Sequence, residues 1–457
     1  MRGRRTRSGA DAPAPVLWTS GRARRGRSFA SPAVSRRRPL LDGAARHVAL
    51  RRVAEIADAL DRDPDAWPLS RADDPAGLRS ASLASGRAGL ALFHAWAARA
   101  GADANGEARA ATRLGEAFDL VASRTMNASL FCGFTGVAWV AHLLTPQGEE
   151  DPVAEVDDAL LGALDDDGFA PPYDLIDGLA GIGVYALARL PRPAARRMAE
   201  RVVDRLAERA SAESVGRSWR SGAASRRALA SGVATTADAP YWNLGLAHGV
   251  PGALGFLARA LRAGVRATQA RALLEDGAAW LVAQRLPAGA GGAFADFVAE
   301  DVPPEPARLA WCYGDPGAAL GLLAAARALE RADLESVALD VARLAARRPL
   351  EGSAVVDTGL CHGSAGLAHV FHRLARATGD ATCLAAARRW LAETLVPRPE
   401  RGGVAGFATY SFERVREGEY VEDPCLLTGA AGVGLALLAA TTDVPPAWDA
   451  AFLMDVT

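Results

Sequence analysis

The stretch LCHGSAGLAHVF, residues 360–371, contains the pattern that decides the fold of this 457-residue chain. Gly363 is followed three residues later by Gly366, and an apolar run begins at the second glycine. The same Gly-x-x-Gly pattern opens six other apolar runs, and successive copies lie 45 to 71 residues apart. Those six copies begin at Gly86, Gly133, Gly178, Gly249, Gly314 and Gly429.

Two kinds of helical pattern alternate along these repeats. An Ala/Leu-rich pattern follows each Gly-x-x-Gly, and a more charged one precedes the next copy, as in residues 193–210, with apolar residues at a spacing of three to four. Each unit is therefore interpreted as an outer amphipathic helix, a loop, and an inner helix that starts at the glycines. Glycine permits a positive φ in such a turn and a close approach of neighbouring helices.

Seven helical hairpins of this kind predict an all-α fold, because one hairpin cannot bury its apolar face alone. We expect an α/α toroid with the seven Gly-x-x-Gly turns around one mouth. The Gly/Ser/Pro-rich intervals 211–240 and 286–306 are predicted to be surface loops near that mouth.

The composition predicts a soluble globular protein with a large core, since 50% of the residues are hydrophobic, 23% are charged and the net charge is −1. The sequence shows no secretory signal and no apolar run long enough to span a membrane. Residues 1–45 form a basic segment predicted to be disordered, either an arm for an acidic partner or a tail without a role. The toroid is expected over residues 46–457, with no nucleic-acid partner.

Three potential zinc ligands stand just before two consecutive turns. Cys312 belongs to the fifth copy, and Cys361 and His362 belong to the sixth. Because the turns converge on one mouth, these three side chains are predicted to bind one Zn²⁺. Two thiolates and an imidazole leave the fourth tetrahedral position open, which is typical of a catalytic zinc site.

The other cysteines and histidines are interpreted as structural. Free cysteine often packs as a small hydrophobic residue, and no export signal suggests disulfides. Asp177 is predicted to be a helix N-cap. The residues given packing roles are Cys132, Cys383, Cys425, His47, His94, His142, His369 and His372.

Three turn sequences, GLAHGVPG, WCYGDPG and CHGSAGLAH, occur in this order on the repeats. From about residue 46 to the C-terminus the chain thereby resembles the lanthionine synthetase C-like family, the zinc-dependent cyclases of lanthipeptide biosynthesis. The resemblance implies a seven-hairpin α/α barrel, in agreement with the repeat count.

The resemblance also implies roles for individual residues. Cys312, Cys361 and His362 match the zinc ligands of the family. His248 matches its acid/base histidine, and Asp174 matches the aspartate that supports that histidine. Arg308 and Tyr313 match further pocket residues, for which ordinary positioning and packing is the alternative.

The implied reaction is the addition of a cysteine thiol of a precursor peptide to a dehydroalanine or dehydrobutyrine of the same peptide, which forms a thioether ring. Zinc would hold water or the substrate thiolate at its open position, since coordination deprotonates a thiol. Imidazole suits proton transfer at neutral pH, so His248 is expected to protonate the enolate. Arg308 is expected to stabilise the oxygen of the enolate.

Two other functions are compatible with the sequence. One is the addition of glutathione or another thiol to dehydrated residues, and the other is a zinc-containing scaffold that binds peptides without chemistry. A scaffold would need neither His248 nor Asp174. A cyclase implies a dehydrated precursor peptide as substrate, with a dehydratase and an exporter as partners. Its expected location is the cytoplasm, where the protein would be free or peripherally associated with a membrane-bound biosynthetic complex. No inserted domain for substrate recognition is found near the third repeat.

Overall fold

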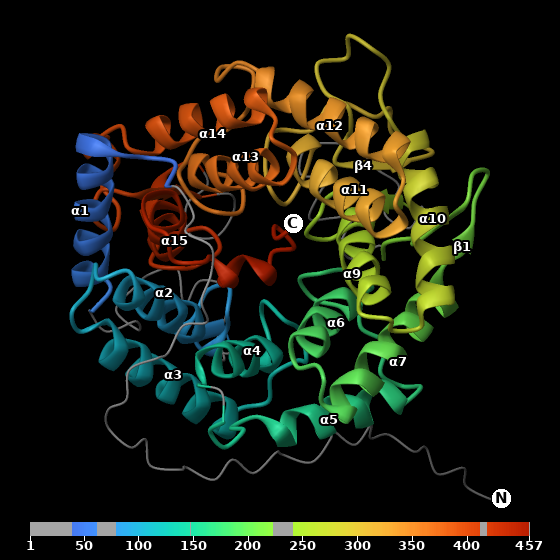
Figure 1. Cartoon of the computed structure of the whole chain (residues 1–457), viewed down its shortest axis with the longest axis horizontal. Coiled ribbons are helices and arrows are strands. Elements are labelled where there is room, and N and C mark those ends of the chain that lie inside the picture. The colour runs from blue at the N-terminus through green and yellow to red at the C-terminus, as the bar shows by residue number, and fades with distance from the viewer. Residues whose placement is uncertain (1–38, 62–78, 147, 223–240, 412–417, 457) are drawn as a thin grey trace, which may run out of the picture.

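The computed structural model describes residues 39–61, 79–146, 148–222, 241–411 and 418–456. Within these ranges fourteen α-helices form two concentric rings (Figure 1). The inner ring contains α2 (Arg87–Arg99), α4 (Phe134–Leu144), α6 (Leu179–Ala188), α9 (Val250–Arg262), α11 (Asp315–Leu329), α13 (Ser364–Thr378) and α15 (Ala430–Thr441). The outer ring contains α1 (Gly43–Ala59), α3 (Gly106–Ser123), α5 (Ala154–Asp165), α7 (Pro193–Arg209), α10 (Ala267–Ala283), α12 (Ala332–Arg347) and α14 (Ala381–Thr394). The predicted all-α toroid is confirmed.

The two rings differ in burial as their sequences require. All twelve residues of α15 are buried, because an inner helix contacts both the outer ring and the centre of the toroid. The outer helix α7 buries one face, with Met198, Val202 and Leu206 at helical spacing. Most of its charged residues lie on the other face, although Arg205 is buried.

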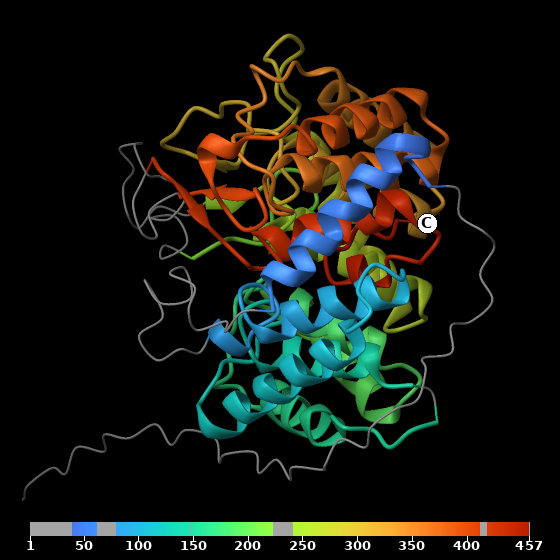
Figure 2. The same ribbon diagram turned by 90° about the vertical axis from the view of Figure 1, so that its left-hand side faces the viewer.

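The helical pairing differs from the predicted order within a unit. The closest packing joins an inner helix to the outer helix that follows it, as in α2 with α3, α11 with α12 and α13 with α14. The outer partner of the last inner helix, α15, is α1 from the start of the chain. In Figure 2 α1 crosses the outside of α15. The first and last described helices therefore close the ring.

The N-terminal boundary lies slightly earlier than predicted. Helix α1 begins at Gly43, and the Arg46 guanidinium donates to the carbonyl of Thr441 at the end of α15 at 2.7 Å. The helical part thus starts three residues before residue 46. The predicted basic segment lies outside the described residues as far as residue 38.

In the described part of the chain, six short strands interrupt the all-α pattern. They form three antiparallel two-stranded sheets, β1 (Ser211–Ala212) with β2 (Arg217–Ser218), β3 (Tyr241–Asn243) with β4 (Phe297–Ala299), and β5 (Ala408–Tyr410) with β6 (Tyr420–Glu422). Strands β1, β2 and β4 lie in intervals predicted to be loops only. Residues 223–240 of the first interval lie outside the described residues. Figure 2 shows β5 and β6 projecting from one end of the ring, with the C-terminus towards the other.

The loops before the inner helices are joined into a closed circle by backbone hydrogen bonds. Each loop donates at least one N–H to a carbonyl of the next loop, at distances of 2.8–3.4 Å. The seven donor–acceptor pairs are Leu427–Ala84, Ala84–Phe131, Phe131–Ile176, Ile176–Ala247, Ala247–Cys312, Cys312–Cys361 and Cys361–Leu427. Residues far apart in sequence are thereby fixed side by side at one end of the barrel.

The Gly-x-x-Gly pattern is required mainly for close packing. A Cβ on Gly136 would lie 2.0 Å from the carbonyl oxygen of Leu130 and 2.8 Å from the Cβ of Leu83 in the preceding unit. A Cβ on Gly89 would meet Leu426, so the same contact closes the ring. Gly314 adopts the positive φ that glycine permits, at +78°. The backbone at the first glycine of the other six motifs is extended.

A Gly136→Ala substitution is expected to destabilise the fold by about 3 kcal/mol, because the new methyl group collides with a fixed backbone carbonyl. Gly115→Ala provides the control, since a Cβ there meets nothing within 4 Å on the exposed face of α3. That control should stabilise the protein by about 0.5–1 kcal/mol. Urea denaturation measures both changes, and equal stabilities of the two variants would contradict the packing role.

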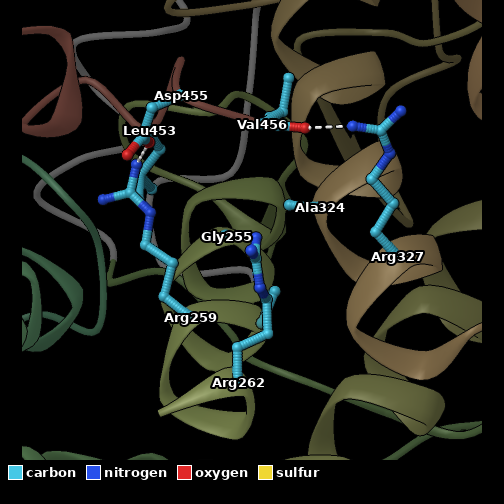
Figure 3. Close-up of a pocket in the computed structure, with 9 residues that line it drawn as sticks. Gly255, Arg259, Arg262, Ala324, Arg327, Leu453, Asp455 and Val456 are labelled. Atoms are coloured by element: carbon cyan, nitrogen blue, oxygen red, sulfur yellow. Dashed lines mark hydrogen bonds and ion pairs between the residues drawn. The ribbon is translucent and has the colours of Figure 1, made fainter. Parts of the chain in front are cut away.

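The C-terminal segment occupies the centre of the ring (Figure 1). It includes a short 3-10 helix, Ala447–Ala450, and packs Trp448 and Phe452 into the core. Arg327 of α11 donates to the carbonyl of Val456, and Arg259 of α9 pairs with Asp455 (Figure 3). A small, partly open pocket beside this segment is lined by none of the predicted site residues.

Candidate metal and proton-transfer site

Consecutive loops of the circle position the predicted metal ligands. The N–H groups of Trp311 and Cys312 both donate to the carbonyl of Cys361, at 3.0 and 3.2 Å. His362 follows directly, and α13 begins two residues later at Ser364. One potential ligand atom from each of Cys312, Cys361 and His362 lies within 4.8 Å of the other two. The three residues that the sequence analysis grouped therefore lie together in the structure.

The chemistry of this cluster suits Zn²⁺. Both cysteines are free and mostly buried, with exposures of 4% and 9%. The Cys361 thiol donates to the sulfur of Cys312 and so lowers the pKa of Cys312, with further help from His362. The same interaction raises the pKa of Cys361. A divalent cation such as Zn²⁺ would displace the thiol protons and bind both sulfurs as thiolates.

Asp357 is a residue of the site that the sequence analysis missed. Its Oδ2 lies 3.5 Å from Nε2 of His362, which leaves Nδ1 of the ring for a cation. The carboxylate is 4% exposed and also accepts from the N–H groups of Gly359 and Tyr410. Burial lowers the pKa of His362, but Asp357 and Cys312 outweigh it and raise the pKa to about 9. A carboxylate behind a metal-binding histidine orients the ring and makes it more basic.

Asp357→Asn should therefore weaken binding of the cation by about 10- to 100-fold. The measurement is competition with a chromophoric chelator at pH 9.5, where protonation of His362 no longer competes with the metal. Asparagine retains an oxygen for the N–H of Gly359 and loses the acceptor for the N–H of Tyr410, so thermal unfolding is measured beside the affinity to follow the loop. Unchanged affinity would show that Asp357 does not act on the ligand.

The second predicted group, His248 and Asp174, also forms as expected. Nδ1 of His248 lies 3.0 Å from Oδ2 of Asp174, and Oδ1 of the aspartate accepts from the N–H of Asp177 at 2.8 Å. Burial lowers the pKa of His248, but the hydrogen bond and charge of Asp174 raise it above the ordinary value, with smaller contributions from Asp177 and Cys312. The side chain of His248 is 35% exposed and so is open to a substrate, whereas that of Asp174 is 9% exposed.

The prediction that Asp177 is an N-cap is wrong. Helix α6 has Gly178 at its N-cap and no side-chain capping bond, because the preceding loop is stabilised through Asp174 instead. The carboxylate of Asp177 lies within 4.8 Å of the ligand atoms of Asp174 and His248. Asp177 therefore adds negative charge near the histidine.

Tyr313 and Arg308 lie close to the two groups. The Tyr313 ring stacks on His248, with centroids 6.5 Å apart and an interplanar angle of 29°. Its hydroxyl accepts from the Asn243 amide at 3.2 Å, and burial raises the pKa of the phenol. The positive charge of Arg308 acts to lower the pKa values of both Cys312 and Cys361. At Cys361 this effect only partly opposes the rise caused by Cys312 and burial.

Asp296 adds a carboxyl group that no sequence pattern indicated. It precedes β4, and its Oδ1 is buried without a hydrogen-bond partner among the described residues. Burial and the nearby Cys312 sulfur raise the pKa of Asp296 to about 6, although Arg308 opposes them. Asp296 lies in a Gly-rich stretch without periodicity, so its place beside Cys312 could not be predicted from the sequence.

The residues predicted to be structural lie outside both groups. His369 pairs with Asp449 at 2.8 Å, His94 pairs with Asp103 at 3.2 Å, and His142 contacts the carbonyl of Ala188 at 2.9 Å. Burial raises the pKa of Cys383 to about 12. Within the described residues the potential metal-binding groups are the two named above, and they include none of Cys132, Cys383, Cys425, His47, His94, His142, His369 and His372.

Comparison with known proteins agrees with this geometry. The family model described as lanthionine synthetase C-like protein matches residues 78–453. This chain belongs to the lanthionine synthetase C-like family. Among solved structures it is similar to one titled nisin cyclase, with a TM-score of 0.65 and 18% sequence identity over 90% of this chain and 97% of that one. No curated protein sequence matches the chain. Among the helices that the structure describes, none has the length and apolar character needed to cross a bilayer.

Proposed function

We propose that this lanthionine synthetase C-like protein is a zinc-dependent peptide cyclase. It would add cysteine thiols of a precursor peptide to dehydroalanine or dehydrobutyrine residues of the same peptide and so form lanthionine or methyllanthionine rings. The observation that carries the proposal is the Cys312, Cys361 and His362 cluster on the loop circle beside the His248–Asp174 pair.

The donor set fits one Zn²⁺ with an open fourth position, because three ligand atoms converge and no fourth cysteine or histidine joins them within the described residues. When bound, zinc would supply a sulfur nucleophile by lowering the pKa of the substrate thiol. Cys312, Cys361 and His362 would hold the ion, and Asp357 would orient His362 from behind.

His248 would transfer the proton of the reaction, and Asp174 would support His248. Thiol addition forms a carbon–sulfur bond at the β-carbon, and the electron pair of the C=C bond moves to the α-carbon and its carbonyl. The thiol loses one proton and the α-carbon gains one, so one acid/base group can balance the reaction. Asp174 holds Nδ1 of His248 and leaves Nε2 to exchange the proton. Arg308 would stabilise negative charge on the enolate oxygen.

The test is incubation of the purified protein with Zn²⁺ and a dehydrated peptide that retains its cysteines. Alkylation followed by mass spectrometry counts the free thiols that remain. Loss of thiols without a change of peptide mass is expected, because cyclisation is an isomerisation. Persistence of all thiols would refute the cyclase, and a mass increase with added glutathione would support intermolecular thiol addition.

The same function implies a dehydratase to prepare the substrate and an exporter for the product, in the cytoplasm or beside a membrane-bound complex. Genes for a precursor peptide and a dehydratase next to this one would support the proposal. The His248–Asp174 pair favours catalysis over a binding scaffold, since peptide binding alone needs no hydrogen-bonded histidine and carboxylate at the metal cluster.

A further inference from the structure

The C-terminal segment 445–456 is held inside the barrel by polar side chains from several inner helices. Arg259 of α9 donates to the carbonyl of Ala450 at 2.8 Å, and Arg373 of α13 donates to that of Met454 at 3.2 Å. Trp96 of α2 donates to the carbonyl of Pro445 at 2.9 Å. With Arg327, which donates to the carbonyl of Val456, these side chains fix the path of the segment across the centre. Figure 3 shows Arg259 and Arg327 beside the end of the segment.

One residue connects this segment to the metal cluster. Trp311, which directly precedes Cys312, donates its indole N–H to the carbonyl of Phe452 at 2.9 Å. The rings of Trp311 and Phe452 meet edge to face with centroids 5.1 Å apart, and both residues are fully buried. The backbone N–H of Trp311 bonds to Cys361. Trp311 is thus fixed by the C-terminal segment through its side chain and by the second cysteine through its backbone.

We propose that the C-terminal segment is a positioning element for the metal site and acts through the Trp311–Phe452 hydrogen bond. Rotation of Trp311 would turn the backbone at Cys312 and move its sulfur away from Cys361. The segment prevents that rotation, because the carbonyl of Phe452 has a fixed place against α9 and α13. The inference rests on the zinc site of the proposed function, but its test requires metal binding alone.

The experiment compares Trp311→Phe with Trp448→Phe in the full-length protein. Trp448 belongs to the same aromatic cluster, is also fully buried, and contacts Phe452 edge to face at 5.8 Å. Its indole N–H has no hydrogen-bond partner among the described residues. The two variants therefore lose the same atoms from one cluster, and only Trp311→Phe loses the hydrogen bond.

The probe is Co²⁺, whose thiolate charge-transfer absorption reports the geometry of the two sulfurs. We expect Trp311→Phe to bind Co²⁺ about tenfold more weakly than the natural protein and to show an altered charge-transfer band. Trp448→Phe should retain the natural affinity and spectrum. Metal-free Trp311→Phe should unfold at a somewhat lower temperature than Trp448→Phe, because the carbonyl of Phe452 loses its donor only in the first variant.

Equal Co²⁺ affinities for the two variants would overturn the inference. If Trp311→Phe does not fold, Arg259→Gln replaces it, since the Arg259 side chain is 22% exposed and its loss loosens the segment from a distance. Faster release of Co²⁺ to a chelator by Arg259→Gln would support the positioning role, and an unchanged rate would overturn it. Failure of the natural protein to bind Co²⁺ would refute the metal site itself, which is a different result.

Discussion

Cys361→Ala is expected to contain no bound metal after purification and to form no thioether rings. The substitution removes one of three ligands, and we expect the affinity for Zn²⁺ to fall by at least about a hundredfold. The fold should persist, because Cys361 contributes to the loop circle through its N–H and carbonyl, which alanine retains. Elemental analysis gives the metal content per chain, and circular dichroism follows the helices.

Cys383→Ala is the matched control for this experiment. It makes the same substitution at a fully buried cysteine in α14, outside the metal-binding group. The control should keep both metal and activity and lose only a little stability. If Cys361→Ala retained one zinc per chain and continued to close rings, the proposed site would be wrong.

The toroid could be predicted from the sequence because its repeat has a strict steric cause. In all seven motifs the second glycine lies against the backbone carbonyl of the residue six positions before it. Examples are Gly136 against Leu130 and Gly432 against Leu426. A larger residue at any of these positions would open the circle, so glycine marks all seven turns. The convergence of Cys312 and Cys361 follows from their places on adjacent turns.

Asp357 shows a signal that was present in the sequence but not used. The position six residues before the first glycine of the motif is Asn or Asp in four of the seven units. In each case the side chain accepts from the N–H two residues later and so shapes the turn. The four residues are Asn127, Asn243, Asp357 and Asp423. At Asp357 the second oxygen is left to face His362.

Other features depend on tertiary contacts that have no local signature. Strand β4 forms only because β3 lies beside it, and the paired residues Trp242 and Val298 are fifty-six positions apart in the sequence. The C-terminal segment 445–456 lacks periodicity, and the inner helices provide the arginines that hold it. Sequence patterns describe how an element is built more readily than what it will contact.

His248→Ala is expected to keep its zinc and to lower the rate of ring formation by about 10²- to 10⁴-fold, which is the usual contribution of an acid/base residue. Asp174 holds His248, and neither residue belongs to the Cys312 cluster, so metal content should not change. Liquid chromatography with mass spectrometry of alkylated peptide gives the rate. His47→Ala, at an exposed position on α1, is the control and should be fully active.

The pH dependence separates a proton-transfer role of His248 from a purely structural one. Asp174 raises the pKa of His248, so the protonated acid persists to higher pH, and the rate should fall as the pH rises through that raised value. Asp174→Asn removes the charge that raises the pKa of His248, so the fall in the rate of ring formation should occur at lower pH. If the rate dropped but its fall stayed at the same pH, Asp174 would orient a histidine that does not carry the proton.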